Sequence, residues 1–326
     1  MSNKPQKIKI GIMGCAKIAK RSTLPALQEL DNLFEIVAIS SRDYSKAKFL
    51  ANEFNCIAVH GYDALLSMKN LDAVYIPLPT GLHEEWINKA LDADLHVYAE
   101  KSIAMCQLEA KAMVSKASTK SLALMEGYMF QYHSQYNIIK NLINKGEVGE
   151  VRSFHGSFCF PALSKSDFRY NMNIGGGVVM DAAGYPLRAA HHLFGHDLKV
   201  KASSLHFDSQ LQSVIWGSAF LANNTGFGGS INFGFDNYYQ CRFEICGSKG
   251  KIVAERAFTP SKDMNPSIYL EKNGKIGSVI TKPDNHFIKA FREFYFIINE
   301  TSKRQQHYDD IILQSQSLDL INQLAK

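Results

Sequence analysis

The sequence predicts an α/β protein of two domains: a doubly wound parallel sheet, then an α+β domain whose sheet is mainly antiparallel. Three observations support this prediction. The length of 326 residues exceeds what one ordinary hydrophobic core covers and suggests about two domains. Short apolar runs alternate with helical segments up to residue 126, and beyond residue 148 apolar residues recur at every second position. We therefore expect domains at residues 1–126 and 127–326.

The elements of the first domain follow from short apolar runs without polar alternation. Such strands, separated by helices, are typical of a parallel sheet that is covered on both faces. The expected strands span residues 8–13, 35–40, 73–78, 96–99 and 122–126. The expected helices between them include residues 16–30, 45–54 and 83–92.

The elements of the second domain follow from a period of two. Phe154, Gly156, Phe158 and Phe160 share one face of the first strand. Further strands are expected at residues 200–207, 213–221, 228–235, 239–246 and 251–255, and Gly247-Ser248-Lys249-Gly250 suits a hairpin turn. Many consecutive strands with few helices predict an antiparallel sheet in an α+β domain. Helices are expected at residues 136–144, 286–299 and 309–324.

Composition argues against several classes of protein. No apolar run approaches the ~20 residues of a membrane span, and the polar residues 1–7 do not form a signal peptide, so a cytoplasmic location is expected. The six cysteines contain no C-x-x-C pair, and we expect reduced thiols, mostly small core residues. The net charge of +5 is dispersed, without the basic stripe typical of nucleic-acid binding.

A dinucleotide-binding turn is predicted at the end of the first strand. The segment Gly14-Cys15-Ala16-Lys17-Ile18 follows the strand and leads into a helix. Gly14 allows a tight turn, and the N–H groups and dipole of the following helix favour a pyrophosphate. Ala16 stands where glycine is commoner, and a glycine-rich strand end without a ligand would have a similar pattern.

The end of the second strand bears on the choice of cofactor. Ser41 and Arg42 offer a hydroxyl and a planar guanidinium to a 2′-phosphate, where an acidic residue would favour the 2′-hydroxyl of NAD. Asp43 lies close to these residues, and a surface arginine at a strand end is common. The pattern favours NADP(H) over NAD(H).

Motifs along the chain resemble those of the glucose–fructose oxidoreductase/inositol dehydrogenase/MocA family. They are Pro77-Leu78-Pro79-Thr80-Gly81-Leu82-His83, Ala90-Leu91, His96-Val97, Glu100-Lys101, the segment from Gly175-Gly176-Gly177 to Asp181, and the hairpin at residues 247–250. The resemblance covers nearly the whole chain. It implies a Rossmann domain followed by an open-faced sheet for substrate binding and oligomerisation, with homodimers or homotetramers joined through that sheet.

Two positions depart from the commonest family pattern. Ser102 follows Glu100-Lys101 where the family usually has proline, and Tyr185 stands where many members have histidine. In having tyrosine at this position, the chain resembles the branch of the family that contains glucose–fructose oxidoreductase, dimeric dihydrodiol dehydrogenase and the sugar 3-ketoreductases of deoxysugar pathways. Within this branch, the chain most resembles the 3-ketoreductases in three segments: Phe168-Arg169-Tyr170, the triglycine and Tyr185-Pro186-Leu187-Arg188-Ala189-Ala190.

The resemblance implies a catalytic set of Lys101, Asp181 and Tyr185. Lys101 follows a parallel strand, at the sheet edge where ligands bind, and Asp181 and Tyr185 are one helical turn apart. Hydride transfer to a carbonyl leaves an oxyanion, which needs a cation and a proton donor. Lys101 can supply the first and Tyr185 the second, or the reverse. The alternatives are a Lys101–Glu100 pair, an interface tyrosine and a carboxylate at a helix N-terminus.

Other candidates surround this set. Pro79, Thr80, His83, Glu100 and Lys101 are expected at the cofactor, although a packing role for His83 and a structural role for Glu100 are open alternatives. Arg169 and Arg188 are expected at a substrate diphosphate and Tyr170 in the sugar pocket, together with Asp181 and Tyr185. Ion pairs and aromatic packing are the alternatives for these three.

The histidine cluster is not expected to bind a metal. His192 and His196 have the spacing of helical ligands, but Gly195 between them suits a helix C-cap, so His196 leaves the face of the helix. No paired carboxylate motif accompanies the histidines.

Three functions are consistent with the sequence. The leading hypothesis is NADPH-dependent reduction of a 3-keto group on a nucleotide-linked deoxysugar. A second is oxidation or reduction of a free sugar or a trans-dihydrodiol, with turnover that needs no nucleotide on the substrate. A third is a non-catalytic NAD(P)-sensing regulator, a class that the family includes as the yeast galactose repressor. Neither nucleic acid nor a membrane is an expected partner.

Overall fold

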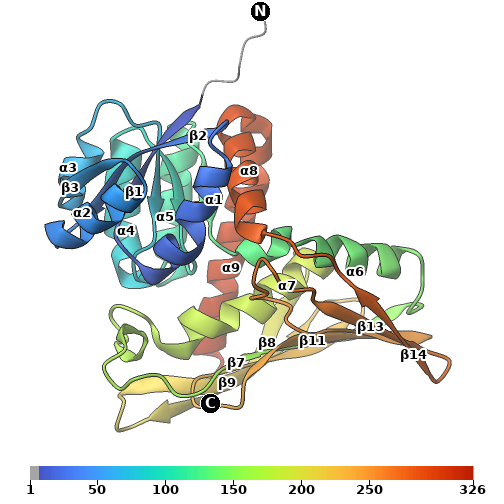
Figure 1. The fold of residues 1–326 in the computed structure, drawn as a ribbon. Helices are drawn as coiled ribbons and strands as arrows, with labels where there is room; N and C mark the ends of the chain where they lie inside the picture. Colours follow the sequence, from blue (N-terminus) through green and yellow to red (C-terminus); the bar gives the residue numbers. More distant parts are fainter. Residues whose placement is uncertain (1–6, 326) are drawn as a thin grey trace, which may run out of the picture. The chain divides into compact units, whose positions relative to one another are not determined.

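The computed structural model describes residues 7–325, which form two compact units (Figure 1). The first unit contains the chain up to Gly127 together with Phe287–Ile312, and the second contains Tyr128–His286 and residues 313–325. This division differs from the expected domains of 1–126 and 127–326, because a C-terminal segment returns to the first unit. Residues 1–6, which are part of the segment expected not to form a signal peptide, lie outside the described residues.

The first unit is built on a parallel sheet, as predicted. Within residues 7–325 it has six strands in the order β3-β2-β1-β4-β5-β6, and all neighbouring strands are parallel. The strands are β1 (Ile8–Met13), β2 (Phe34–Ser41), β3 (Ile57–His60), β4 (Ala73–Ile76), β5 (His96–Ala99) and β6 (Leu124–Glu126). The sequence pattern does not predict β3, because none of its four residues is fully buried.

Helices cover this sheet. They are α1 (Leu24–Glu29), α2 (Tyr44–Glu53), α3 (Tyr62–Leu66), α4 (His83–Asp92), α5 (Gln107–Thr119) and α8 (His286–Asn299), with the first part of α9 (Arg304–Gln323). The sequence pattern does not predict α5, because alanines make up half of its buried face, which consists of Ala110, Met113, Val114 and Ala117. The helix expected at residues 309–324 begins earlier, at Arg304.

Aromatic packing explains why α8 belongs to the first unit (Figure 1). The buried ring of Phe291 lies 4.8 Å from Tyr98 and 5.8 Å from Tyr75, between ring centroids, and 5.9 Å from Phe34. Burying a phenylalanine side chain contributes ~1.5–3 kcal/mol. The amphipathic pattern of residues 286–299 therefore predicts the helix correctly, whereas its docking partner comes from strands far away in the sequence.

The helix after β1 is not the single α-helix expected at residues 16–30. Helical backbone starts at Lys17, but a π-helical turn, η1 (Ala19–Thr23), precedes α1. Pro25 lies at the start of α1, inside this helical run, and its missing N–H removes one backbone hydrogen bond of the run. Single π-turns inside helices occur frequently at functional sites.

The second unit contains a long, mostly antiparallel sheet. Over residues 7–325 its eight strands follow the order β14-β13-β12-β11-β7-β10-β9-β8, and β7 and β10 form the parallel pair. The strands are β7 (Val151–Cys159), β8 (Lys199–Asp208), β9 (Ser213–Ala222), β10 (Gly228–Gly234), β11 (Gln240–Gly247), β12 (Gly250–Ala254), β13 (Ser267–Lys272) and β14 (Lys275–Ile280). The predicted hairpin at residues 247–250 is confirmed by the antiparallel pairing of β11 with β12. The pattern does not predict β14, because this strand is exposed along its whole length.

The two faces of this sheet differ. One face contributes to a hydrophobic core with α6 (Ser134–Asn144) and α7 (Gly184–Phe194), which lie on the same side of the sheet in Figure 1. The other face exposes Trp216, Phe220 and Tyr269, and His206 stacks on Trp216 with ring centroids 3.7 Å apart. The expected fold class, with an open-faced sheet, is confirmed.

The cysteines are free, as expected, but they are not mostly core residues. Only Cys159 and Cys241 are buried, and the other four are partly exposed. Their positions in turns and at strand ends explain the difference for Cys15 and Cys246. Across the described residues, every helix is too short or too polar to serve as a membrane span.

Candidate functional site

The turn after β1 has the backbone that the sequence predicts. Gly14 has φ +118°, a conformation that other residues rarely adopt. Its N–H donates to the Ser40 carbonyl oxygen at 2.9 Å, and a Cβ at this position would lie 3.1 Å from Leu78. Cys15 and Ala16 are partly exposed, and the helix begins at Lys17. The turn therefore brings backbone N–H groups and a helix N-terminus to one strand end, which suits an anion.

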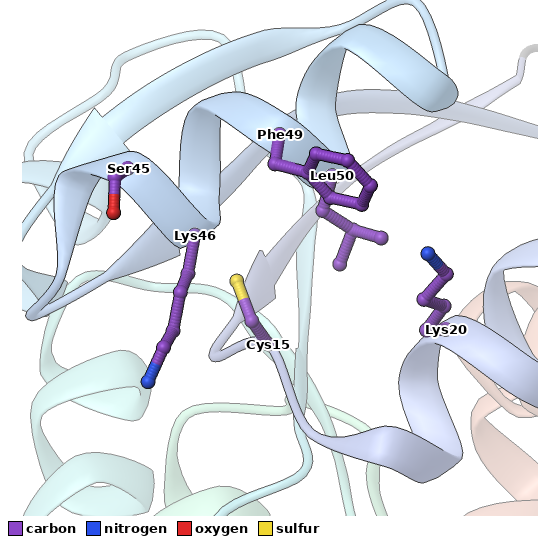
Figure 2. A pocket seen from close by; sticks show the side chains of 6 residues that line it. All are labelled: Cys15, Lys20, Ser45, Lys46, Phe49 and Leu50. Carbon is purple, nitrogen blue, oxygen red and sulfur yellow. The ribbon is translucent and has the colours of Figure 1, made fainter.

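A pocket of about 310 Å³ lies beside this turn (Figure 2). It is lined by Cys15, Lys20, Ser45, Lys46, Phe49 and Leu50. Lys20 forms an ion pair with Glu53 at 2.9 Å, and its ammonium lies 4.6 Å from the centre of the Phe49 ring. Lys46 lies 3.7 Å from Asp43 Oδ2, so both lysines of the lining are paired with carboxylates. Our sequence-based candidates do not include Lys20 and Lys46, although each lies within the first two turns of a helix that follows a candidate loop.

The loop after β2 separates the roles of its three polar residues. Asp43 caps α2 by accepting hydrogen bonds from the backbone N–H groups of Ser45 and Lys46, at 3.0 and 3.4 Å. The Ser45 hydroxyl also donates to this carboxylate and lowers the pKa of Asp43. Ser41 is buried and its hydroxyl oxygen accepts from the Asp43 N–H, whereas Arg42 is exposed. Asp43 is thus engaged as a helix cap, and the Arg42 side chain forms a hydrogen bond with Tyr62.

His83 connects two loops of the first unit. Its buried ring places Nδ1 2.9 Å from the Ser102 carbonyl oxygen and Nε2 2.8 Å from the Leu78 carbonyl oxygen. Burial lowers the pKa of His83 to about 4, so the ring is neutral at pH 7 and donates from one nitrogen. This geometry supports a positioning role for His83 between the loops after β4 and β5. The Lys101–Ser102 peptide, where the family usually has proline, is cis.

Pro79 and Thr80 form the other part of the loop after β4. Pro79 has extended backbone, and Thr80 begins a short 3-10 turn, η2 (Thr80–Leu82), that leads into α4. The Thr80 side chain is buried. The structure thus contains the expected helix start after β4.

Glu100 is held by its own unit. Its Oε1 accepts a hydrogen bond from the Tyr75 hydroxyl at 2.6 Å, and its carboxylate also accepts from the Lys101 backbone N–H. Burial raises the pKa of Glu100, while Tyr75 and the Lys101 ammonium act in the opposite direction. These contacts support a structural role for Glu100 beside the candidate catalytic Lys101.

In the second unit, steric contacts and backbone conformation explain why three consecutive residues of the triglycine segment are glycine. A Cβ at Gly175 would lie 2.6 Å from both the Arg169 Cα and the Phe168 carbonyl oxygen. Gly176 and Gly177 have φ of +72° and +67°, which glycine adopts without cost. Helical backbone starts at Gly177, and a π-helical turn, η5 (Val179–Ala183), replaces part of the expected α-helix.

Asp181 and Arg169, two of the predicted site residues, form an ion pair with each other. Arg169 Nε donates to Asp181 Oδ2 at 3.0 Å, and its Nη1 donates to Asp167 Oδ1 at 3.1 Å. The guanidinium also lies 4.8 Å from the centre of the Phe168 ring. Two carboxylates therefore partly neutralise Arg169.

Tyr185 lies in an aromatic cluster. Its ring centroid is 4.5 Å from that of Phe158, 5.6 Å from Tyr128 and 5.7 Å from Phe130, and the residue is 7% exposed. The adjacent Gly184 makes room for this packing, because a Cβ there would overlap the Tyr128 hydroxyl. The cluster fixes the ring and shields it from solvent, so Tyr185 is not a tyrosine whose hydroxyl lies in bulk water.

Tyr170 and Arg188 are also buried in the second unit. The Tyr170 hydroxyl accepts from the Leu163 N–H at 3.1 Å, and its ring meets Phe235 edge-on. Arg188 Nε donates to Gln131 Oε1 at 3.3 Å. Arg188 is therefore not a surface arginine, whereas the contacts of Tyr170 match those of a packing residue.

The histidines of α7 contact protein groups. Gly195 has φ +90° and forms the C-cap, as predicted. His191 Nε2 lies 3.1 Å from the Leu198 carbonyl oxygen, and His192 Nε2 lies 3.0 Å from Lys140 Nζ. The described part of the chain contains no group of three or more His, Cys, Asp or Glu residues arranged to hold a metal ion.

Comparison with known proteins identifies the family. One family model, described as an oxidoreductase family with an NAD-binding Rossmann fold, matches residues 8–128, and the GFO/IDH/MocA C-terminal domain matches residues 136–253. A dTDP-3,4-didehydro-2,6-dideoxy-alpha-D-glucose 3-reductase of Saccharopolyspora spinosa is 38% identical over 287 residues, with 88% of this chain and 86% of that protein covered. The chain belongs to the Gfo/Idh/MocA family. As a Gfo/Idh/MocA protein it is an oxidoreductase, and the predicted enzyme class is confirmed.

Solved structures of the Gfo/Idh/MocA family agree with the fold. The 3-ketoreductase KijD10 of Actinomadura kijaniata, in complex with NADP and TDP-benzene, has a TM-score of 0.95 and 34% identity, with 98% of each chain covered. Variants of KijD10 with one tyrosine or one lysine replaced have also been solved with the same two ligands. An aldose–aldose oxidoreductase of Caulobacter crescentus has a TM-score of 0.89 at 20% identity and shares the fold.

Proposed function

We propose that this chain is an NADP(H)-dependent reductase of a 3-keto group on a nucleotide-linked deoxysugar. The observation that carries the proposal is the likeness, over 98% of both chains, to a 3-ketoreductase bound to NADP and TDP-benzene. The Saccharopolyspora relative, a reductase of a dTDP-linked sugar, supports the same substrate class. The open alternatives, a free-sugar or dihydrodiol dehydrogenase and a non-catalytic regulator, lack an observation of this weight.

Residues of the first unit would hold the cofactor. The backbone at Gly14, Cys15, Ala16, Lys17 and Ile18 would face the pyrophosphate, because the turn and the helix N-terminus present N–H groups there. Ser41 and Arg42 would bind the 2′-phosphate, beside the pocket that Lys20 and Lys46 line. Pro79, Thr80 and the Glu100-Lys101 segment would border the nicotinamide half, with His83 holding their loops in place.

The candidate catalytic residues are Lys101 and Tyr185. When bound, the nicotinamide supplies the hydride. The Lys101 ammonium would stabilise the developing oxyanion, and the Tyr185 hydroxyl would donate the proton, or the two groups would exchange these roles. Asp181 would keep the start of its helix in place through the Arg169 ion pair.

We further propose where the substrate and a second copy of the chain bind. Arg188, Arg169 and Tyr170 would contact the nucleotide-linked sugar, with the charge of Arg169 reduced by Asp167 and Asp181. The second unit would form a homodimer or homotetramer through the open face of its sheet, where large apolar side chains are exposed. A cytoplasmic location is consistent with the free cysteines.

Replacing Arg42 with alanine should weaken NADPH binding and leave NADH binding nearly unchanged. A hydrogen bond to a charged group is worth ~1.5–3 kcal/mol, so we expect a roughly 10-fold to 100-fold rise in the NADPH dissociation constant. Fluorescence titration with both cofactors measures this. Arg292→Ala, in an exposed position on α8, is the matched control. An equal loss for NADPH and NADH would contradict a 2′-phosphate role for Arg42.

Nucleotide-linked sugars should change the fluorescence of the enzyme–NADPH complex. We expect a response to one of the dTDP-, UDP- or GDP-linked sugars and to its nucleoside diphosphate, because the non-reacting parts of a substrate contribute binding energy. Turnover of the matching 3-keto sugar is then measured by NADPH absorbance. Turnover of free sugars or dihydrodiols without any nucleotide response would establish the second function. Cofactor binding without turnover of any of these compounds would favour the regulator.

A further inference from the structure

Three side chains form a buried hydrogen-bond chain behind the candidate cofactor edge of the first unit. The Thr23 hydroxyl lies 3.0 Å from the Tyr75 hydroxyl, which lies 2.6 Å from Glu100 Oε1. Thr23 and Tyr75 are both 0% exposed. Thr23 ends the π-helical turn after the Gly14 turn, Tyr75 belongs to β4, and Glu100 follows β5. The chain therefore connects the proposed pyrophosphate helix with the segment that carries Lys101.

The hydrogen bonds of this chain run in one direction. An ionised carboxylate only accepts hydrogen bonds, so Tyr75 donates to Glu100 and its oxygen accepts from Thr23. Burial and the neighbouring Glu100 carboxylate hold the pKa of Tyr75 well above its usual value, which keeps its hydroxyl protonated. Hydrogen bonds that involve an ionised partner are about twice as strong as neutral ones, so Tyr75 is the principal link.

Packing leaves the chain little freedom to rearrange. The Tyr75 ring meets Tyr98 and Phe291 edge-on, with centroids 5.5 and 5.8 Å away. On the opposite side of Glu100, a Cβ at Gly127 would lie 3.1 Å from the Glu100 Cα and 3.3 Å from Oε2. The carboxylate is thus confined between Tyr75 and the backbone that enters the second unit, and it accepts from the Lys101 N–H.

We propose that Tyr75 and, through it, Thr23 are positioning residues that hold the Glu100 carboxylate and thereby fix the backbone of Lys101 at the cofactor. The proposal rests on the proposed function, since it assigns Lys101 to that reaction. Neither residue touches the reacting atoms. Their effect passes through one carboxylate, which orders the Lys101 N–H and offers a negative charge to the Lys101 ammonium.

The charge of Glu100 is the sensitive quantity. Tyr75 from β4 and the neighbouring Lys101 are titratable groups that act on it, while the segment after β6 presents Gly127 without a side chain. Burial raises the pKa of Glu100, and the Tyr75 hydrogen bond lowers it. Loss of the Tyr75 hydroxyl therefore raises this pKa further. The carboxylate then protonates at a higher pH, and its bond to the Lys101 N–H weakens as the pH falls.

The test uses Tyr75→Phe in the full-length enzyme, with two measurements. The first is kcat as a function of pH with whichever sugar the wild type reduces. We expect a ~10-fold to 100-fold lower kcat, as for a small misplacement of a catalytic group. We also expect the acidic limb of the pH profile to move to higher pH. The second is the NADPH dissociation constant as a function of pH without sugar, which should rise on acidification earlier than in the wild type. Thr23→Val should show the same changes more weakly. Thr23→Ser keeps the hydroxyl and should have the wild-type kcat and NADPH profiles.

The controls separate positioning from stability. Tyr136→Phe removes the hydroxyl of another buried tyrosine, whose bond to the Ala257 carbonyl oxygen lies in the second unit, and both pH profiles should stay those of the wild type. If Tyr75→Phe lowers the melting temperature but keeps both wild-type profiles, the positioning role is wrong. If the wild type binds NADPH but reduces no sugar, the proposed function fails, and the NADPH profile still decides the role of Tyr75.

Discussion

Replacing Tyr185 with phenylalanine is expected to lower kcat by about 10²–10⁴, the usual contribution of a general acid, with NADPH affinity unchanged. Phenylalanine keeps the ring, so the packing against Phe158, Tyr128 and Phe130 is retained. The loss therefore reports on the hydroxyl. Steady-state kinetics with the nucleotide-linked 3-keto sugar, together with NADPH titration, measure the two quantities separately.

Tyr136→Phe is the matched control for this experiment, because Tyr136 is also buried in the aromatic core of the second unit. It should keep kcat close to that of the wild type. A parallel fall of kcat and cofactor affinity in Tyr185→Phe would indicate that the variant perturbs the fold. In that case Tyr185 would be a packing residue, as the aromatic cluster alone would suggest.

The sequence predicts most of the fold because burial produced clear patterns. Continuous apolar runs mark β1, β4 and β5, which are almost entirely buried, and alternation marks β7 and β11. The unpredicted β14 has neither pattern, because both of its faces are exposed. The return of α8 to the first unit has no local signal, since it depends on the contacts of Phe291 with residues of three different strands.

The candidate site is predictable to a different extent. The turn at Gly14 and the triglycine are visible in the sequence because the positive φ of Gly14, Gly176 and Gly177 favours glycine. Side-chain partners have no such signal. The sequence contains three candidate carboxylates, but only the structure shows their partners. Asp43 caps a helix, Asp181 pairs with Arg169, and Glu100 accepts a hydrogen bond from Tyr75. A carboxylate near a motif can bind a ligand or support the fold, and spacing does not separate these roles.

Replacing Lys101 with methionine is expected to lower kcat by about 10²–10³, the usual cost of removing one group that stabilises an oxyanion. Methionine retains much of the length of the side chain and removes the charge. Lys89→Met, which removes a lysine that pairs with Asp63 and Glu85 on the surface, should leave kcat unchanged. Pre-steady-state measurement of hydride transfer identifies whether the loss lies in the chemical step.

The double variant Lys101→Met/Tyr185→Phe tests whether the two groups act on the same atom. Groups that stabilise one oxyanion together are strongly non-additive, so the double variant should lose little more than the more severe single variant. Losses that multiply would place the two groups in separate steps, with one of them at the cofactor.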